Sequence, residues 1–270
     1  MNPPLSSGKR RGSVLLTQNI LGYTVYSASL GQCVDSIVSR ITSKDAPCWL
    51  ACINPHSYVA ALDESDFSDA LHGADWLIPD GSGIVLASYL LGGNIRQRIT
   101  GSDIFSALNS RANELGGFSV FFLGVTPDCL EEIRVRMGRE YPQIRFAGSY
   151  SPLFKQDYTE EELEAMFAAI NQARPDILWV GMTAPKQEKW IHQNLHRLDV
   201  CFAAAIGAVF DFYTGRVKRS HPVFQRLGLE WLPRLIQEPG RLWKRMFISA
   251  PVFMWHVLRA RLRSSVKSEL

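Results

Sequence analysis

The chain has 270 residues, 46% hydrophobic and 20% charged, a composition typical of a globular protein with one or two domains. Its net charge of +3 is unevenly placed: residues 215–270 hold nine Arg and three Lys against three Glu, a net charge of +9, which leaves −6 for residues 1–214. The five cysteines are odd in number, include no Cys-x-x-Cys pair and lie mostly in apolar runs, which indicates reduced, cytosolic use and not a disulfide framework.

Residues 1–13 lack the apolar core of a signal peptide, so we expect a disordered leader. After it, apolar runs alternate with stretches of helical spacing. The predicted strands cover residues 20–26, 49–53, 76–78, 118–123, 144–148, 177–180 and 201–206. The predicted helices cover residues 30–42, 58–71, 83–91, 101–115, 129–139, 159–173 and 186–195. Thr159 with Glu162 predicts a capping box, and Ser102 or Asp103 is expected to cap the helix from 101.

This alternation predicts an α/β protein with a Rossmann-like, doubly wound, mostly parallel sheet. Strand signals stop near Pro222, and residues 226–236 and 241–262 have helical patterns. We therefore expect an α/β domain over residues 14–221 and a basic, aromatic-rich helical appendage over residues 222–270. The longest apolar run, Phe247 to Leu258, is shorter than the about 20 residues of a transmembrane helix.

Four loops directly follow predicted strands, at residues 54–56, 79–81, 124–128 and 183–188. In a parallel sheet all four open at the same edge, where ligands bind outside the carboxyl ends of the strands. Helix N-termini at that edge attract phosphate, so together the loops favour a nucleotide-type ligand over simple turn-making. The residues expected at this cleft are Asn54, Asp80, Gly124, Thr126, Lys186 and Gln187.

The most informative loop carries Asp80, which follows a short apolar strand and precedes Gly81–Gly83. A carboxylate at this point can act as a base, bind a sugar hydroxyl or cap the next helix. The Gly-Ser-Gly run also begins like a dinucleotide fingerprint, with Asp103 about 20 residues on, which keeps an NAD-binding oxidoreductase open. The chain has no P-loop and no Asp-x-Asp, which weakens a metal–diphosphate clamp.

The basic tail interleaves Arg and Lys with Trp and Phe. Arg binds phosphates in bidentate fashion, and its mixture with aromatic residues suits a membrane interface with anionic lipid. Nucleic acid and a solvated amphipathic face are the alternatives for this segment. A non-enzymatic membrane- or nucleic-acid-binding module is therefore a further hypothesis.

Four motifs, read together, make the sequence resemble the WecG/TagA/CpsF glycosyltransferases from about residue 20 to residue 247. They are LIPDGSG at 77–83, RITGSD at 98–103, APKQEKW at 184–190 and LEWLPRLIQEP at 229–239. The resemblance implies a bacterial enzyme, peripheral on the cytoplasmic face of the inner membrane, that moves a hexose or N-acetylhexosamine from a UDP-sugar to a polyprenyl-diphosphate-linked sugar. Donors in this family include UDP-N-acetylmannosamine, its uronic acid and UDP-glucose, for teichoic acid, enterobacterial common antigen or exopolysaccharide.

Carried over residue by residue, the resemblance implies that Asp80 is the catalytic base and that Gly81 and Gly83 give room near the sugar nucleotide. The residues it places around the donor are Asn54, Arg98, Gln187 and Asp211. The residues it places at the acceptor diphosphate or membrane are Arg234, Arg241, Lys244 and Arg245. This chain departs from the family pattern at Cys52, where the family has Thr, and at Lys244, where it has a tail Arg.

Transfer to a sugar hydroxyl needs a base for its proton, and the leaving diphosphate needs positive charge. Without Asp-x-Asp, that charge must come from helix N-termini, Arg and Lys. We therefore expect transfer with no metal and no other cofactor, with inversion by direct displacement, and no nucleic-acid partner. The sequence leaves open the donor sugar, the acceptor sugar, the polysaccharide and the oligomeric state, a homo-oligomer included.

Overall fold

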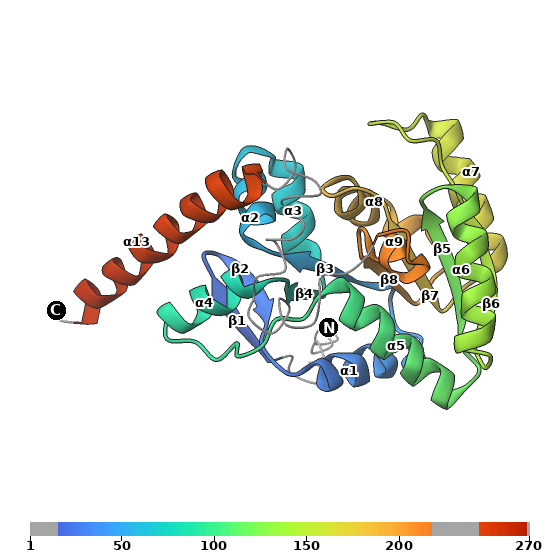
Figure 1. The fold of residues 1–270 in the computed structure, drawn as a ribbon, viewed down its shortest axis with the longest axis horizontal. Coiled ribbons are helices and arrows are strands. Elements are labelled where there is room, and N and C mark those ends of the chain that lie inside the picture. Colours follow the sequence, from blue (N-terminus) through green and yellow to red (C-terminus); the bar gives the residue numbers. More distant parts are fainter. Residues whose placement is uncertain (1–15, 218–242, 269–270) are drawn as a thin grey trace, which may run out of the picture.

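The computed structural model describes residues 16–217 and 243–268, and its centre is a six-stranded parallel sheet (Figure 1). The strand order is β4-β3-β8-β7-β5-β6. The strands are β3 Cys48–Ile53, β4 Trp76–Pro79, β5 Ser119–Gly124, β6 Arg145–Tyr150, β7 Ile177–Gly181 and β8 Phe202–Ala205. After β4 the chain crosses to the far half of the sheet, and such a reversal leaves a ligand-binding crevice at the carboxyl ends of the strands.

Helices cover both faces of this sheet, which confirms the predicted doubly wound α/β fold. One face carries α2 Pro55–Asp63, α3 Ser65–Gly73, α4 Ser82–Leu90, α7 Glu160–Ala173, α8 Lys186–Asn194 and the C-terminal α13 Ala250–Ser268. The other carries α1 Leu30–Ser43, α5 Gly101–Leu115, α6 Pro127–Glu140 and α9 Val209–Thr214. Side chains alternate between the faces: in β3, Trp49 and Ile53 join the first layer and Leu50 the second.

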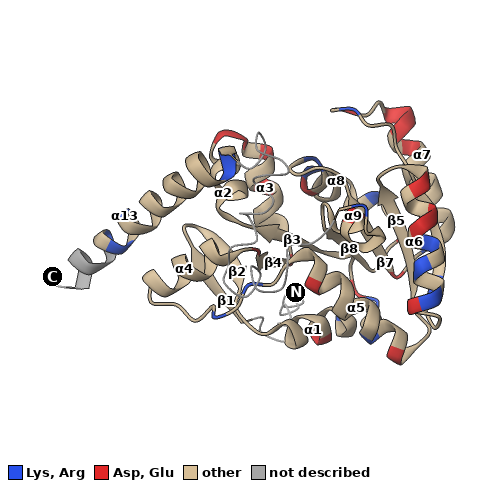
Figure 2. Ribbon diagram, viewed as in Figure 1, with Lys and Arg blue, Asp and Glu red and all other residues tan. Residues whose placement is uncertain are grey.

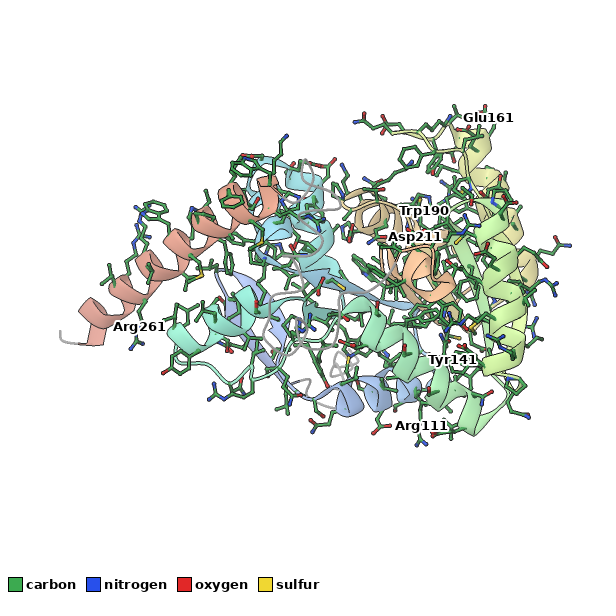
Figure 3. All side chains as sticks on the ribbon, in the orientation of Figure 1. Arg111, Tyr141, Glu161, Trp190, Asp211 and Arg261 are labelled. Atoms are coloured by element: carbon green, nitrogen blue, oxygen red, sulfur yellow. The ribbon has the colours of Figure 1, made fainter. Side chains whose placement is uncertain are left out.

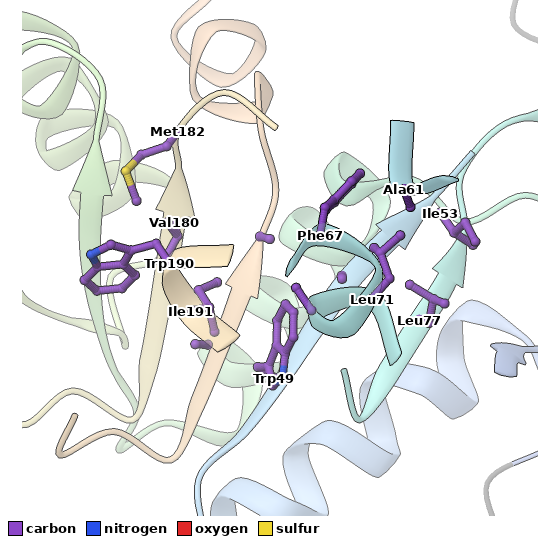
Figure 4. Packing of buried hydrophobic residues seen from close by; sticks show 14 of the residues in the cluster. Trp49, Ile53, Ala61, Phe67, Leu71, Leu77, Val180, Met182, Trp190 and Ile191 are labelled. Atoms are coloured by element: carbon purple, nitrogen blue, oxygen red, sulfur yellow. The ribbon is translucent and has the colours of Figure 1, made fainter. Parts of the chain in front are cut away.

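The core between the sheet and helices α2, α3 and α8 fixes the strand ends that carry the site (Figure 4). Trp49 is 2% exposed and packs in one cluster with Leu71 of α3 and Ile191 of α8. Its indole N–H donates to the carbonyl of Gly73 at 2.9 Å, so this buried polar atom is satisfied. Strand β3 and these two helices therefore form one packed unit.

Three local predictions are wrong. Residues 20–26 do not form one strand: β1 Thr17–Ile20 and β2 Tyr23–Tyr26 form an antiparallel hairpin, turned by Leu21 and Gly22 at positive φ. The helix predicted over 58–71 is two helices, because Glu64 is extended and its neighbours favour helix starts over helix interiors. The cap of α5 is Thr100, and Asp103 is its partner in a capping box. The box predicted for Thr159 and Glu162 is confirmed.

The C-terminal segment consists of a π-helix, η2 Lys244–Ser249, which continues into α13. Phe253 and Val257 of α13 are fully buried against α2 and α4, so the body covers one side of the appendage. The helix predicted over 226–236, the leader and the boundary at 221/222 lie outside the described residues. Within the described ranges, no helix combines the length and apolarity needed to cross a membrane.

Candidate active site

The ends of β3 and β4 bring three predicted site residues together. The backbone N–H of Asp80 donates to the carbonyl of Ile53, directly before Asn54, at 2.8 Å. The N–H of Ile99, directly after Arg98, donates to the last carbonyl of β4 at 2.9 Å. Backbone pairing thus continues beyond the strands and holds Asn54, Asp80 and Arg98 at one point of the carboxyl edge.

Asp80 is half-buried on a turn that its neighbours make rigid. Gly81 has φ +99°, a conformation that L side chains rarely adopt, and it is the N-cap of α4. Because α4 has no side-chain cap, the interpretation of Asp80 as a helix cap is wrong. A Cβ on Gly83 would lie 2.4 Å from Cγ of Pro55, so this glycine permits α4 to pack on α2 and does not give room to a ligand.

Asn54 ends β3 and begins α2. Its side-chain oxygen accepts the backbone N–H groups of His56 and Ser57, both at 3.0 Å. These bonds orient the amide, so its NH₂ group is the donor that Asn54 can offer to a ligand. Helix α2 therefore begins at the carboxyl edge of the sheet, with Pro55 in its first turn and its N-terminal dipole at that edge.

On the far side of the edge, Gln187 ties the start of α8 to the turn after β8. Gln187 is 3% exposed, and its Oε1 accepts the N–H of Gly207 at 3.0 Å. Its Nε2 donates to Oε1 of the next residue, Glu188, at 2.9 Å. Gln187 is thus a buried internal link between two strand-end loops at the carboxyl edge.

Lys186 contacts the segment between β6 and α7. Its ammonium lies 3.6 Å from the ring centre of Tyr158 and donates to the carbonyl of Lys155, both in the segment between β6 and α7. Burial lowers the pKa of Lys186, and the nearby Lys155 adds to this effect. Its predicted role toward the donor remains a prediction.

The other predicted donor residues lie along the same edge. Gly124 ends β5, where an added Cβ would stand 2.3 Å from the carbonyl oxygen of Gly181 in β7, so close strand packing requires the glycine. Thr126 caps α6 by accepting the N–H of Cys129. Asp211 lies in the first turn of α9, next to the loop that Gln187 holds (Figure 3).

Three carboxyl groups lie within electrostatic range of Cys52, the second-to-last residue of β3. Burial raises the pKa of this thiol well above its ordinary value, and the charges of Asp80, Glu188 and Asp103 raise it further. Burial also raises the pKa of Glu188 to about 7. Among the described residues, no group of three or more His, Cys, Asp or Glu side chains has an arrangement that could hold a metal ion.

The C-terminal segment reaches the site through α2. His56 Nδ1 lies 2.9 Å from Ser249 Oγ, and Tyr58 Oη lies 2.8 Å from His256 Nδ1. Basic residues lie at the start of η2 and in the second half of α13 (Figure 2). Of the four predicted tail residues, Lys244 is exposed and Arg245 half-buried on η2, whereas Arg234 and Arg241 lie outside the described residues.

Two residues of this region have no role in the sequence prediction. Glu188 is part of the PKQE motif, and its position in the first turn after a strand was the available signal. His56 directly follows Asn54 and Pro55, but its contact with Ser249 joins residues 193 positions apart, which no local pattern shows.

A model of the "Glycosyl transferase WecG/TagA/CpsF family" matches residues 18–267. Similar curated proteins are N-acetylglucosaminyldiphosphoundecaprenol N-acetyl-beta-D-mannosaminyltransferases. That of Bacillus subtilis is 32% identical over 90% of this chain and 91% of the relative, and that of Bacillus spizizenii is 35% identical over 79% of each. That of Staphylococcus aureus strain MW2 is 26% identical over 90% of this chain and 92% of the relative. Family membership leaves the oxidoreductase and non-enzymatic alternatives without support. The chain belongs to the WecG/TagA/CpsF family and is a glycosyltransferase.

Proposed function

We propose that this glycosyltransferase moves N-acetylmannosamine from UDP-N-acetylmannosamine to the N-acetylglucosamine of a polyprenyl-diphosphate-linked acceptor. The Bacillus and Staphylococcus relatives match the chain over most of its length, and their names support this choice of sugar and acceptor. The observation that carries the proposal is the convergence of Asn54, Asp80 and Arg98 at one point of the carboxyl edge.

In the proposed reaction Asp80 takes the proton of the acceptor hydroxyl as its oxygen attacks the anomeric carbon. The bond from that carbon to the diphosphate breaks, UDP leaves from the opposite side, and the configuration inverts. General-base assistance of this kind contributes about 10²–10⁴-fold in rate. The turn at Gly81 supports the role, because the backbone of Asp80 is held at the end of β4 by its bond to Ile53.

The leaving diphosphate carries negative charge that the protein must balance. Helices α2 and α8 begin at the carboxyl edge of the sheet, where their backbone N–H groups attract phosphate. Arg98 stands beside Asp80, and the tail residues Arg234, Arg241, Lys244 and Arg245 are proposed to meet the acceptor diphosphate. The proposal includes transfer without a metal ion. It also includes contacts to the donor from Asn54, Gly124, Lys186, Gln187 and Asp211.

We place the enzyme on the cytoplasmic face of the membrane, where a polyprenyl acceptor is embedded. The outer side of α13 carries the exposed Trp255, Leu258 and Leu262 beside Arg259. Apolar and basic side chains on one helix suit the headgroup region of an anionic bilayer. The contacts of α13 with α2 would hold the site close to that surface.

A UDP-release assay with a panel of UDP-sugars and a short-chain N-acetylglucosaminyl-diphosphate lipid tests the proposal. We expect the fastest release with UDP-N-acetylmannosamine and none without the lipid. Preference for UDP-glucose would overturn the choice of sugar. Absence of acceptor-dependent release with every donor would overturn the proposed function.

A further inference from the structure

The pair formed by Gln187 and Glu188 is buried at the carboxyl edge of the sheet, at the start of α8. Gln187 accepts from the turn after β8 and donates to Glu188 Oε1 at 2.9 Å. Glu188 Oε1 is the acceptor for the NH₂ group of Gln187, so together with the N–H of Gly207 it fixes which way the amide of Gln187 faces. Both side chains are 3% exposed, which keeps the arrangement away from competing water.

The second oxygen of Glu188 has a different environment. Oε2 is buried and, among the described residues, has no hydrogen-bond partner. The lysines on either side are engaged elsewhere: Lys186 with the ring of Tyr158, and Lys189 with Glu64 at 3.0 Å. A buried carboxylate without a cation is costly, and such a group gains a proton instead.

The titratable groups that share this region from other elements are Cys52, the carboxyl groups of Asp80 and Asp103, and Arg98, which follows β4 beside Asp80. Cys52 of β3 lies within electrostatic range of Asp80 after β4, Asp103 of α5 and Glu188 of α8. A negative charge on Glu188 would add to those of the other two carboxylates. It would stand at the edge where the proposed donor brings two more charges on its diphosphate.

We propose that Glu188 is a positioning residue of the donor site that works in its protonated form, with Oε1 holding the amide of Gln187 and the proton on Oε2 removing a charge that would repel the donor diphosphate. The inference rests on the proposed UDP-sugar donor. It is consistent with the pKa of about 7 that burial gives Glu188. Donor binding then takes up a proton from solvent near neutral pH.

Calorimetric titration with UDP-N-acetylmannosamine and no acceptor tests this, because the diphosphate of a UDP-sugar does not itself titrate near pH 7. In the wild type, the dissociation constant is expected to rise by up to about tenfold per pH unit above about pH 7, as linkage of one proton requires. Titrations in two buffers of different ionisation enthalpy should show net proton uptake.

The variant Glu188→Gln keeps the acceptor for Gln187 and has no proton to lose. Its dissociation constant is expected to match the wild type at about pH 6 and to stay level up to about pH 9. The control Glu64→Gln, at the exposed junction of α2 and α3 that pairs with Lys189 of α8, is expected to keep the wild-type profile. A wild-type profile without the rise, or one that Glu188→Gln retains, would overturn the role of Glu188. No binding of any UDP-sugar at any pH would instead overturn the proposed function.

Discussion

Replacing Glu188 with Gln is expected to remove a loss of stability that the wild type suffers as pH rises toward 7. Burial raises the pKa of Glu188 from 4.5 to about 7. Below pH 4.5 the folded and unfolded chains both hold the proton, so the residue carries no penalty. As pH rises toward 7, the unfolded chain releases the proton and the folded chain retains it, so the free energy of unfolding of the wild type falls. Above the folded-state pKa the loss is complete.

The size of this loss follows from the two values. A difference of about 2.5 pH units at about 1.4 kcal/mol per unit gives about 3 kcal/mol. The variant Glu188→Gln lacks this titration, so its stability relative to the wild type is expected to rise by about 3 kcal/mol between about pH 4.5 and about pH 8. Urea unfolding followed by circular dichroism at several pH values measures both proteins.

A surface variant provides the comparison. Glu64→Gln removes the ion pair between Glu64 and Lys189, the residue after Glu188 in α8. Exposed pairs of this kind are worth about 0–1 kcal/mol. A stability difference between Glu188→Gln and the wild type that stays constant with pH would refute the reasoning. It would mean that water or a conformational change stabilises the ionised carboxylate.

Three further predictions concern the packing around the site and the tail. Phe253→Ala should remove about 3–5 kcal/mol of packing free energy and expose the amides of α13 to hydrogen exchange. Trp255→Ala, on the exposed side of the helix, should leave these amides protected, and equal protection in both variants would contradict the docking of α13. Gly83→Ala should lower stability by about 1–3 kcal/mol in thermal melts, since its methyl group meets Pro55, and an unchanged melting temperature would show that α4 shifts freely. Binding to anionic vesicles should weaken as salt rises, and flotation that is insensitive to salt would count against an electrostatic membrane contact.

The sheet was predictable because its strands are short apolar runs between helical patterns, and such runs record burial on both faces. The strand ends were predictable for the same reason: Asn54 and Asp80 follow apolar runs directly, and parallel strands bring their carboxyl ends to one edge. The hairpin was missed because its turn at Leu21 and Gly22 interrupts an alternating pattern that reads as one strand.

The finer arrangement of the site depends on contacts between distant residues. Lys186 has the position of a phosphate ligand in sequence, but the segment at Tyr158 lies close enough to engage its ammonium. Glu188 resembles any acidic residue in a first helical turn, and only its burial and its bond to Gln187 distinguish it. The sequence suggested that Gly83 leaves space for a ligand, but Pro55 of α2 fills the space where its side chain would be.

The central claim is that Asp80 accepts the proton of the acceptor hydroxyl, and Asp80→Asn tests it most directly. The amide keeps the size of the side chain and cannot act as the base. Transfer from labelled UDP-N-acetylmannosamine to the lipid acceptor should fall by about 10²–10⁴-fold, while calorimetry shows donor binding close to the wild type. Transfer near the wild-type rate with intact donor binding would contradict the account.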